Sequence, residues 1–198
     1  MKAKKNLKFI IAALAIAIIS FTFCACDDVG LYGKTEMDYP LAELYTVGDR
    51  GEILYDTASA LIINIDWIKG DVYVNHDDGA TTISFYEVAE GEEPTADRTL
   101  HYLYANSNLS LRYAKSGKFE LGKLKKDLYV TLPADICIGR LNVDSVSGKV
   151  DINITGRIYE INVDSVAGNN SVNATANTVR VDSVSGNVTI NGKVKNAY

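Results

Sequence analysis

The sequence predicts an all-β fold of stacked β-strand repeats, a β-solenoid or β-helix-like architecture with antiparallel hairpin additions in the N-terminal half. One phrase occurs three times near the C-terminus, as VDSVSG at 143–148, VDSVAG at 163–168 and VDSVSG at 181–186. A looser copy, IDWIKG at 65–70, leads into DVYVN, just as the first full copy leads into KVDIN. A period of about 20 residues is typical of stacked repeats, in which each unit buries its apolar face only against its neighbours.

Within each repeat, apolar and polar residues mostly alternate, which is the pattern of a strand with one buried face. In RIYEINVDSVAGNNSVNATA (157–176) the alternation slips between Val163 and Val166, where two polar residues separate the valines. If both valines face the core, the slip predicts a bulge or bend at Asp164-Ser165.

Turns are predicted at two places in each repeat. Gly148, Gly168 and Gly186 end the repeated phrases, where a turn would need a positive φ. A second turn is predicted at 155–156 and at 176–177. Each repeat is therefore expected to run strand, turn, strand, turn.

The rest of the chain is expected to add strands around the repeats. They are predicted at 51–66 with a break at 56–59, at 81–89, at 128–133, and in a hairpin of 100–105 and 109–114. Pro133 must then lie at the end or edge of its strand, because proline cannot donate to the ladder. The acidic segment 90–98 is expected to be an exposed loop, and 115–127 a basic loop with a short strand.

The N-terminal 26 residues differ from the rest. Four lysines precede an apolar run of 15 residues from Phe9 to Phe23. A bilayer span needs about 20 residues, so the run fits a secretory signal peptide better than a membrane helix. We assign 1–25 to a signal peptide, 26–50 to a tether and 51–198 to a β-repeat domain.

The segment Phe23-Cys24-Ala25-Cys26 resembles the lipobox of bacterial lipoproteins, in which a small residue precedes a cysteine that becomes acylated. Cys26 fits this role better than Cys24, because Ala25 is small and Phe23 is not. Phe23 departs from the usual leucine. An uncleaved anchor and a plain signal peptide are the alternatives. The resemblance implies lipidation at Cys26 and an extracytoplasmic protein that is lipid-anchored to the bacterial cell membrane.

Charge excludes one class of partner. Removing residues 1–25 takes four lysines from the 20 Lys and Arg, which leaves 16 against 25 Asp and Glu, a net charge of −9. An acidic domain is a poor nucleic-acid binder, because phosphate contacts need a basic surface. With Cys26 lipidated, Cys137 is the one cysteine left, and its apolar neighbours predict a small buried residue rather than a reactive thiol.

A family resemblance rests on three stretches: IDWIKGDVYV, LYVTLPADICIGRLNVDSVSGKVDI and VDSVSGNVTI. They resemble the bacterial "putative adhesin" family known as domain of unknown function 4097, over roughly 51–198. The resemblance implies a stacked all-β fold at the cell envelope and no established enzymatic activity. Lys149 and Asn187 depart from the pattern, since the family often has aspartate after the glycine.

The aspartates of the repeated phrase are the candidate metal ligands. If the repeats stack in register, Asp144, Asp164 and Asp182 form a column with neighbours about 5 Å apart, and Asp66 is their looser equivalent. One interpretation is a Ca²⁺ site, because Ca²⁺ prefers several oxygen ligands. The simpler one is that each carboxylate bonds its local backbone and faces water, since no D-x-D-x-D-G loop is present. We favour the simpler interpretation and assign no metal and no cofactor.

Other polar and aromatic residues give weaker signals. His76 and His101 have no ligand-type residue at metal-binding spacing, no G-x-S-x-G is present, and no catalytic residue is assigned. Among twelve tyrosines, several are expected on strands, where they pack or bind sugars and proteins. Lysines at 115–126 are expected to form a solvated loop or, alternatively, to face anionic polymers. The tyrosines on predicted strands are Tyr73, Tyr86, Tyr102, Tyr104, Tyr113 and Tyr129, and the lysines are Lys115, Lys118, Lys123, Lys125 and Lys126.

Three functional hypotheses follow. The first is a non-enzymatic, adhesin-like module that binds a protein or glycan at the cell surface, which exposed aromatic residues in a groove would favour. The second is an envelope-stress or scaffold component with a membrane-protein partner, which an apolar edge or patch would favour. The third is a carbohydrate-active β-helix enzyme, which would need paired carboxylates in a cleft.

Overall fold

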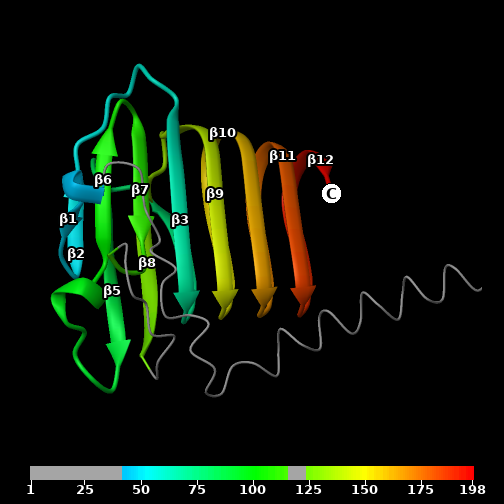
Figure 1. The fold of residues 1–198 in the computed structure, drawn as a ribbon. Coiled ribbons are helices and arrows are strands. Elements are labelled where there is room, and N and C mark those ends of the chain that lie inside the picture. The colour runs from blue at the N-terminus through cyan, green and yellow to red at the C-terminus, as the bar shows by residue number, and fades with distance from the viewer. Residues whose placement is uncertain (1–41, 116–123) are drawn as a thin grey trace, which may run out of the picture.

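The computed structural model describes residues 42–115 and 124–198, which form one curled sheet of 12 strands (Figure 1). The described helices are two short 3₁₀ turns, η2 (Ala42–Leu44) and η3 (Ala96–Arg98), so the predicted all-β repeat fold is confirmed. None of the described helices is long and apolar enough to cross a membrane. The strands are β1 (Thr46–Val47), β2 (Arg50–Ile53), β3 (Leu61–Lys69), β4 (Val72–Asp77), β5 (Ile83–Glu90), β6 (His101–Ala105), β7 (Asn108–Arg112), β8 (Lys125–Pro133), β9 (Cys137–Ser147), β10 (Val150–Ala167), β11 (Asn170–Ser185) and β12 (Val188–Ala197).

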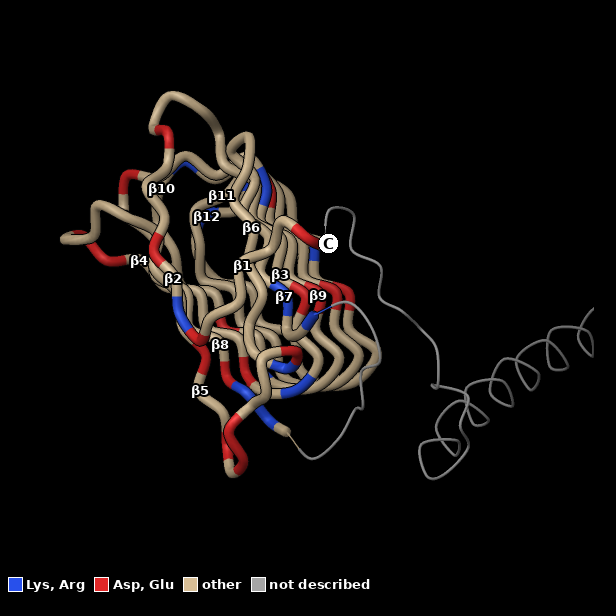
Figure 2. The backbone as a smooth tube through the Cα atoms, turned by 60° about the vertical axis from the view of Figure 1, so that its left-hand side comes forward, with Lys and Arg blue, Asp and Glu red and all other residues tan. Residues whose placement is uncertain are grey.

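The sheet folds into two facing walls with the core between them. The front wall contains β6, β7, β3, β9 and the second parts of β10 and β11, whereas the back wall contains β5, β8, β4 and the first parts of β10 and β11 (Figures 1 and 2). β10 belongs to both walls, since its start pairs with β4 and its end with β9. The core is aliphatic along the repeats, with isoleucine and valine side chains buried from both walls.

The repeated phrase forms successive coils of the stack. Each coil has a front strand, a glycine turn and a back strand, and neighbouring coils pair in parallel and in register. The looser copy is the first coil, because Asp66 pairs with Asp144 and Lys69 with Ser147. The insertion between this coil and the next, residues 78–136, supplies the extra strands at the N-terminal end of the stack.

The predicted glycine turns are confirmed. Gly70, Gly148, Gly168 and Gly186 have φ between 113° and 134°. They also lie on top of one another, since a Cβ atom on Gly168 would lie 1.9 Å from the carbonyl oxygen of Gly148. Glycine is therefore required at these turns for two reasons: it adopts the positive φ, and it leaves room for the close approach of the neighbouring coil.

The predicted bulge at Asp164-Ser165 is wrong. The register runs without interruption through both residues, so alternation continues: Val163 and Ser165 point inward, and Asp164 and Val166 point outward. Serine is tolerated inside because the Ser165 hydroxyl accepts a hydrogen bond from Asn170 Nδ2 at 2.7 Å and donates one to Ser183 Oγ at 3.1 Å. The irregularity lies instead between Ile154 and Ile158. This is the place of the turn predicted at 155–156, and Gly156 has a φ of +130° there.

The N-terminal end contains the predicted hairpin. β6 and β7 pair antiparallel, and Asn106 and Ser107 between them both have positive φ, as a tight hairpin turn requires. Pro133 ends β8 as expected. β1 pairs with β6 and β2 with β5, so the sheet begins at Thr46, inside the segment assigned to the tether. The signal peptide and Cys26 lie outside the described residues.

Candidate functional site

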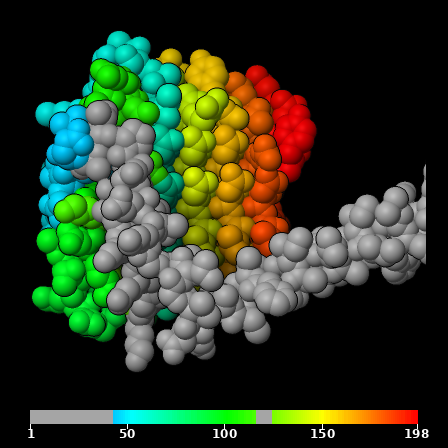
Figure 3. All heavy atoms as spheres, viewed as in Figure 1, coloured from blue at the N-terminus to red at the C-terminus, as the bar shows by residue number. Residues whose placement is uncertain are grey.

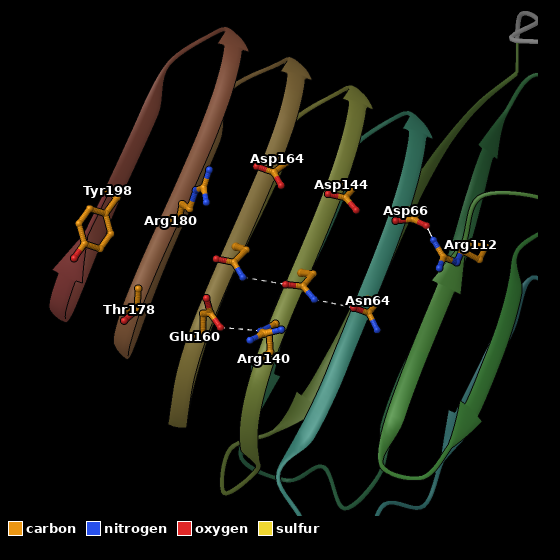
Figure 4. A pocket seen from close by; sticks show the side chains of 12 residues that line it. Asn64, Asp66, Arg112, Arg140, Asp144, Glu160, Asp164, Thr178, Arg180 and Tyr198 are labelled. Carbon is orange, nitrogen blue, oxygen red and sulfur yellow. Dashed lines mark hydrogen bonds and ion pairs between the residues drawn. The ribbon is translucent and has the colours of Figure 1, made fainter. Parts of the chain in front are cut away.

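The outer face of the front wall carries a ladder of asparagine side chains. Asn64 Nδ2 donates to Asn108 Oδ1 at 2.9 Å, Asn142 donates to Asn64 at 2.8 Å, and Asn162 donates to Asn142 at 3.0 Å. Asn64 and Asn142 each donate to one neighbour and accept from the other, Asn162 donates and Asn108 accepts, so the four side chains hold one another in fixed orientations. We call these four residues the Asn column; Figure 4 labels Asn64.

Ion pairs lie on either side of the Asn column. Arg140 Nε donates to Glu160 Oε2 at 2.7 Å, and Arg112 pairs with Asp66 (Figure 4). The hydrogen bond from Arg140, followed by that from Asn162, lowers the pKa of Glu160. These side chains line a shallow hollow of about 890 Å³ that extends across the front wall to Tyr198. The hollow presents guanidinium, carboxylate and amide groups side by side.

The predicted Asp column exists. Asp66, Asp144, Asp164 and Asp182 pair directly across β3, β9, β10 and β11. The first three follow one another on the front wall in Figure 4. Burial raises the pKa of Asp144, opposed by Arg112. Burial also raises the pKa of Asp164, and the charges of Asp144 and Asp182 add to this shift. The expected repulsion between stacked carboxylates is therefore present in the middle of the column.

The two ends of the Asp column are neutralised by arginine. Asp66 pairs with Arg112, and Arg180 Nη2 lies 2.5 Å from Asp182. Within residues 42–115 and 124–198, no group of three or more His, Cys, Asp or Glu is arranged to hold a metal ion. Asp144 and Asp164, which lie between these two ion pairs, form no ion pair with a described residue.

A second column on the same face was missed by the sequence analysis. Ile68, Val146, Val166 and Val184 follow the aspartates two residues later on the front wall, and we call them the Val column. The three valines are exposed, whereas Ile68 is partly buried and packs against the core. They line a mainly apolar groove of about 610 Å³ together with the Asp column. The signal was the alternation slip itself, which we had interpreted as a bulge with the valines inside.

Three tyrosines stack on the back wall. Tyr73, Tyr129 and Tyr86 pair across β4, β8 and β5 with ring centroids 4.9 Å apart and ring planes 11–12° from parallel. Burial, followed by a hydrogen bond to Asp71, raises the pKa of Tyr73 to about 12. Because the rings cover one another's faces, they cannot offer those faces to sugars, and the stack stabilises the sheet instead.

The basic segment does not behave as a solvated loop throughout. Lys126 lies in β8 with a fully buried side chain, its Nζ 2.6 Å from Glu87 Oε2. Its ammonium also donates to the carbonyl oxygens of Arg98 and Tyr113, in addition to the ion pair with Glu87. The Tyr113 ring lies 4.1 Å from Nζ, and Trp67 Nε1 donates to the Lys126 carbonyl oxygen at 2.6 Å. The prediction of exposure is wrong for Lys126 because these partners compensate its burial.

The other predicted residues have ordinary surroundings. Lys125 pairs with Glu90 at 2.7 Å and Lys115 with Asp97 at 3.5 Å, whereas Lys118 and Lys123 lie outside the described residues. His101 is buried with Nδ1 2.8 Å from Thr99 O, and burial lowers its pKa. His76 Nδ1 lies 3.3 Å from Asn153 O, and Cys137 is a half-buried free thiol.

Comparisons with known proteins add little. No protein-family model matches the chain, and no curated protein matches it. One similar solved structure is a "putative cell adhesion protein" from Clostridium sporogenes ATCC 15579, with 11% identity, a TM-score of 0.30, and coverage of 75% of this chain and 97% of that one. Another is a "putative adhesin" from Bacteroides fragilis NCTC 9343, with 13% identity, a TM-score of 0.21, and coverage of 75% and 95%. The family suggested by the repeated phrase stays a prediction.

Proposed function

We propose that this protein is a non-enzymatic, lipid-anchored module of the cell envelope that binds glycans through the hollow of its front wall. The observation that carries the proposal is the row of planar polar side chains that line the hollow and are already held by one another. It is the first of the three hypotheses, in its glycan form.

The side chains of the hollow suit a neutral, hydroxyl-rich ligand. Amides, carboxylates and guanidinium groups offer donors and acceptors in pairs, which match neighbouring hydroxyl groups. The Asn column and the Arg140–Glu160 pair fix these groups before any ligand arrives, which lowers the entropic cost of binding. Tyr198 is 75% exposed at one end of the hollow and offers a ring for stacking.

A glycan array tests the proposal directly, with purified full-length protein in uncharged detergent micelles. Glu160→Gln and Arg140→Met should each weaken binding of a retained glycan about tenfold, because each removes a charged hydrogen-bonding group. Arg50→Met is the control, since Arg50 forms a more exposed pair with Asp49 outside the hollow. Failure to retain any glycan, or equal binding by all three variants, would sink the proposal. Release of new reducing ends would favour the enzyme instead.

The anchor has its own test. If the lipobox assignment is correct, Cys26→Ser removes the acyl acceptor and leaves unprocessed precursor, whereas Cys24→Ser is processed normally. Metabolic labelling with a fatty-acid probe measures both. Undiminished labelling of Cys26→Ser would show that the chain reaches the envelope in another way.

A further inference from the structure

The Val column is an unusual feature for a solvated β-sheet face. Three of its four side chains are classed as exposed, with Val184 at 74%, Val146 at 46% and Val166 at 37%. They come from adjacent strands and point the same way, so they form a continuous apolar line rather than scattered surface residues. A line of this kind gains stability when another apolar surface covers it.

The Asp column runs parallel to the Val column at a fixed distance. Both columns cross the same four strands, β3, β9, β10 and β11, and successive members lie about 4.8 Å apart. Two residues along a strand separate the columns by about 6.6 Å. Figure 3 shows three of these strands, β9, β10 and β11, side by side on one broad face, coloured from yellow-green to orange.

The charges of the Asp column restrict what can cover this face. Asp66 and Asp182 have arginine partners, but Asp144 and Asp164 form no salt bridge with any described residue. A second copy of the chain would bring another row of carboxylates, and anionic lipid would bring phosphates, so both are repelled. A partner with cationic groups beside apolar ones relieves the repulsion and covers the valines.

We propose that the two columns form a docking track for a basic amphipathic helix of another protein, which lies across the strands with leucine-like residues on the Val column and Lys or Arg on the Asp column. One helical turn rises about 5.4 Å, so side chains one turn apart meet successive strands with a mismatch of about 2 Å over the four strands. An extended peptide repeats its side chains on one face about every 6.6 Å and loses register after one strand. The helix and a glycan would share Asp66, Asp144 and Asp164, which line both the groove and the hollow, whereas the Val column lines the groove and not the hollow.

The probe is a synthetic helical peptide of about 18 residues, roughly 27 Å long, with leucines on one stripe and lysines on the neighbouring stripe. Fluorescence anisotropy measures its binding to full-length protein in uncharged detergent. Val146→Thr/Val166→Thr should weaken binding about tenfold, because threonine keeps the shape and strand preference but hydrates the track. Asp144→Asn/Asp164→Asn should weaken it and reduce its salt dependence.

Val88→Thr is the matched control, because Val88 is exposed to a similar degree on β5 of the back wall and should bind the peptide like the wild type. Cooperative thermal melts at or above the wild-type melting temperature show that the variants are folded. Three outcomes overturn the proposal: unchanged binding by the Val146/Val166 variant, equal binding of a peptide with glutamate in place of lysine, or a dimer that buries these valines. Glycan binding by the Val146/Val166 variant separates this result from the proposed function, since the valines do not line the hollow.

Discussion

At the C-terminal end of the stack, the core contains valine, isoleucine and alanine with one hydrogen-bonded pair of buried polar residues, Ser165 and Asn170. At the N-terminal end it contains Trp67, Tyr113, Phe85 and a buried ion pair. The repeated coils need few kinds of contact because each coil presents the same residues to the next. The N-terminal end cannot repeat, since antiparallel strands and an insertion meet there. Its packing therefore depends on contacts that occur once.

The largest effect is expected in the repeated region, at a position between two coils. Val163→Asp places an unpaired charge in the core and should cost about 5 kcal/mol, enough to unfold the protein. Val166→Asp, three residues later, should change the free energy of unfolding by less than about 1 kcal/mol, because that side chain points outward. Urea unfolding of residues 27–198 measures both. Equal losses would mean that the bulge exists after all.

The N-terminal end should respond to the loss of a single partner. Lys126→Met leaves Glu87 buried without its counter-charge, and the expected cost is about 3 kcal/mol. Lys126→Met/Glu87→Leu removes both charges and should recover most of that loss, because a buried pair gives little net stability. Burial already raises the pKa of Glu87 and lowers that of Lys126 to about 8. A double variant as unstable as the single one would show that the pair itself stabilises the fold.

Replacing a glycine by alanine at each end of the molecule compares the two ends without changing a functional side chain. Gly168→Ala should cost about 2–4 kcal/mol, because its φ is +132° and the new methyl group would collide with the Gly148 carbonyl oxygen. Gly91→Ala has a similar positive φ of +88°, but nothing lies within 4 Å, so it should cost only about 1 kcal/mol. Melting temperatures of the two variants measure the difference. Equal shifts would assign the whole effect to φ.

The smallest effect is expected within the Asp column. Since the pKa of Asp164 is raised in the folded state, that state binds more protons than the unfolded state above pH 3.8, and stability falls as the pH rises through the folded pKa. Asp164→Asn should remove this fall and stabilise the protein by up to about 1 kcal/mol at pH 7, with little change at pH 3. Asp182→Asn should instead destabilise the protein at pH 7, because asparagine cannot form the ion pair with Arg180. Melts at both pH values test this, and a stabilisation of wild type by Ca²⁺ would contradict it.

Repetition explains what the sequence could predict. The spacing of VDSVSG established parallel stacking, the glycine turns and the Asp column, because identical residues in register must lie side by side. The looser IDWIKG copy was recognised for the same reason. Val166 was predicted to lie inside the core, whereas the structure places Ser165 there, because Ser165 is held by Asn170 across the glycine turn of its own coil and by Ser183 of the next coil. Nothing in the sequence indicated that Lys126 would be buried beside Glu87. The carbonyl oxygens that accept hydrogen bonds from Lys126 belong to Arg98 and Tyr113, and only the fold brings them together.

Local stability is expected to decrease along the stack toward β12. Val188 is 44% exposed although Asn170 and Val150, at the same place in the preceding coils, are almost fully buried. Among the described strands, β12 has only β11 as a neighbour, so it loses about half of the interface energy that holds an inner coil. Local opening should therefore begin at β12 and become rarer toward β9, as fraying does along a linear array. The middle of the Asp and Val columns lies on β9 and β10, where the protein keeps its shape longest.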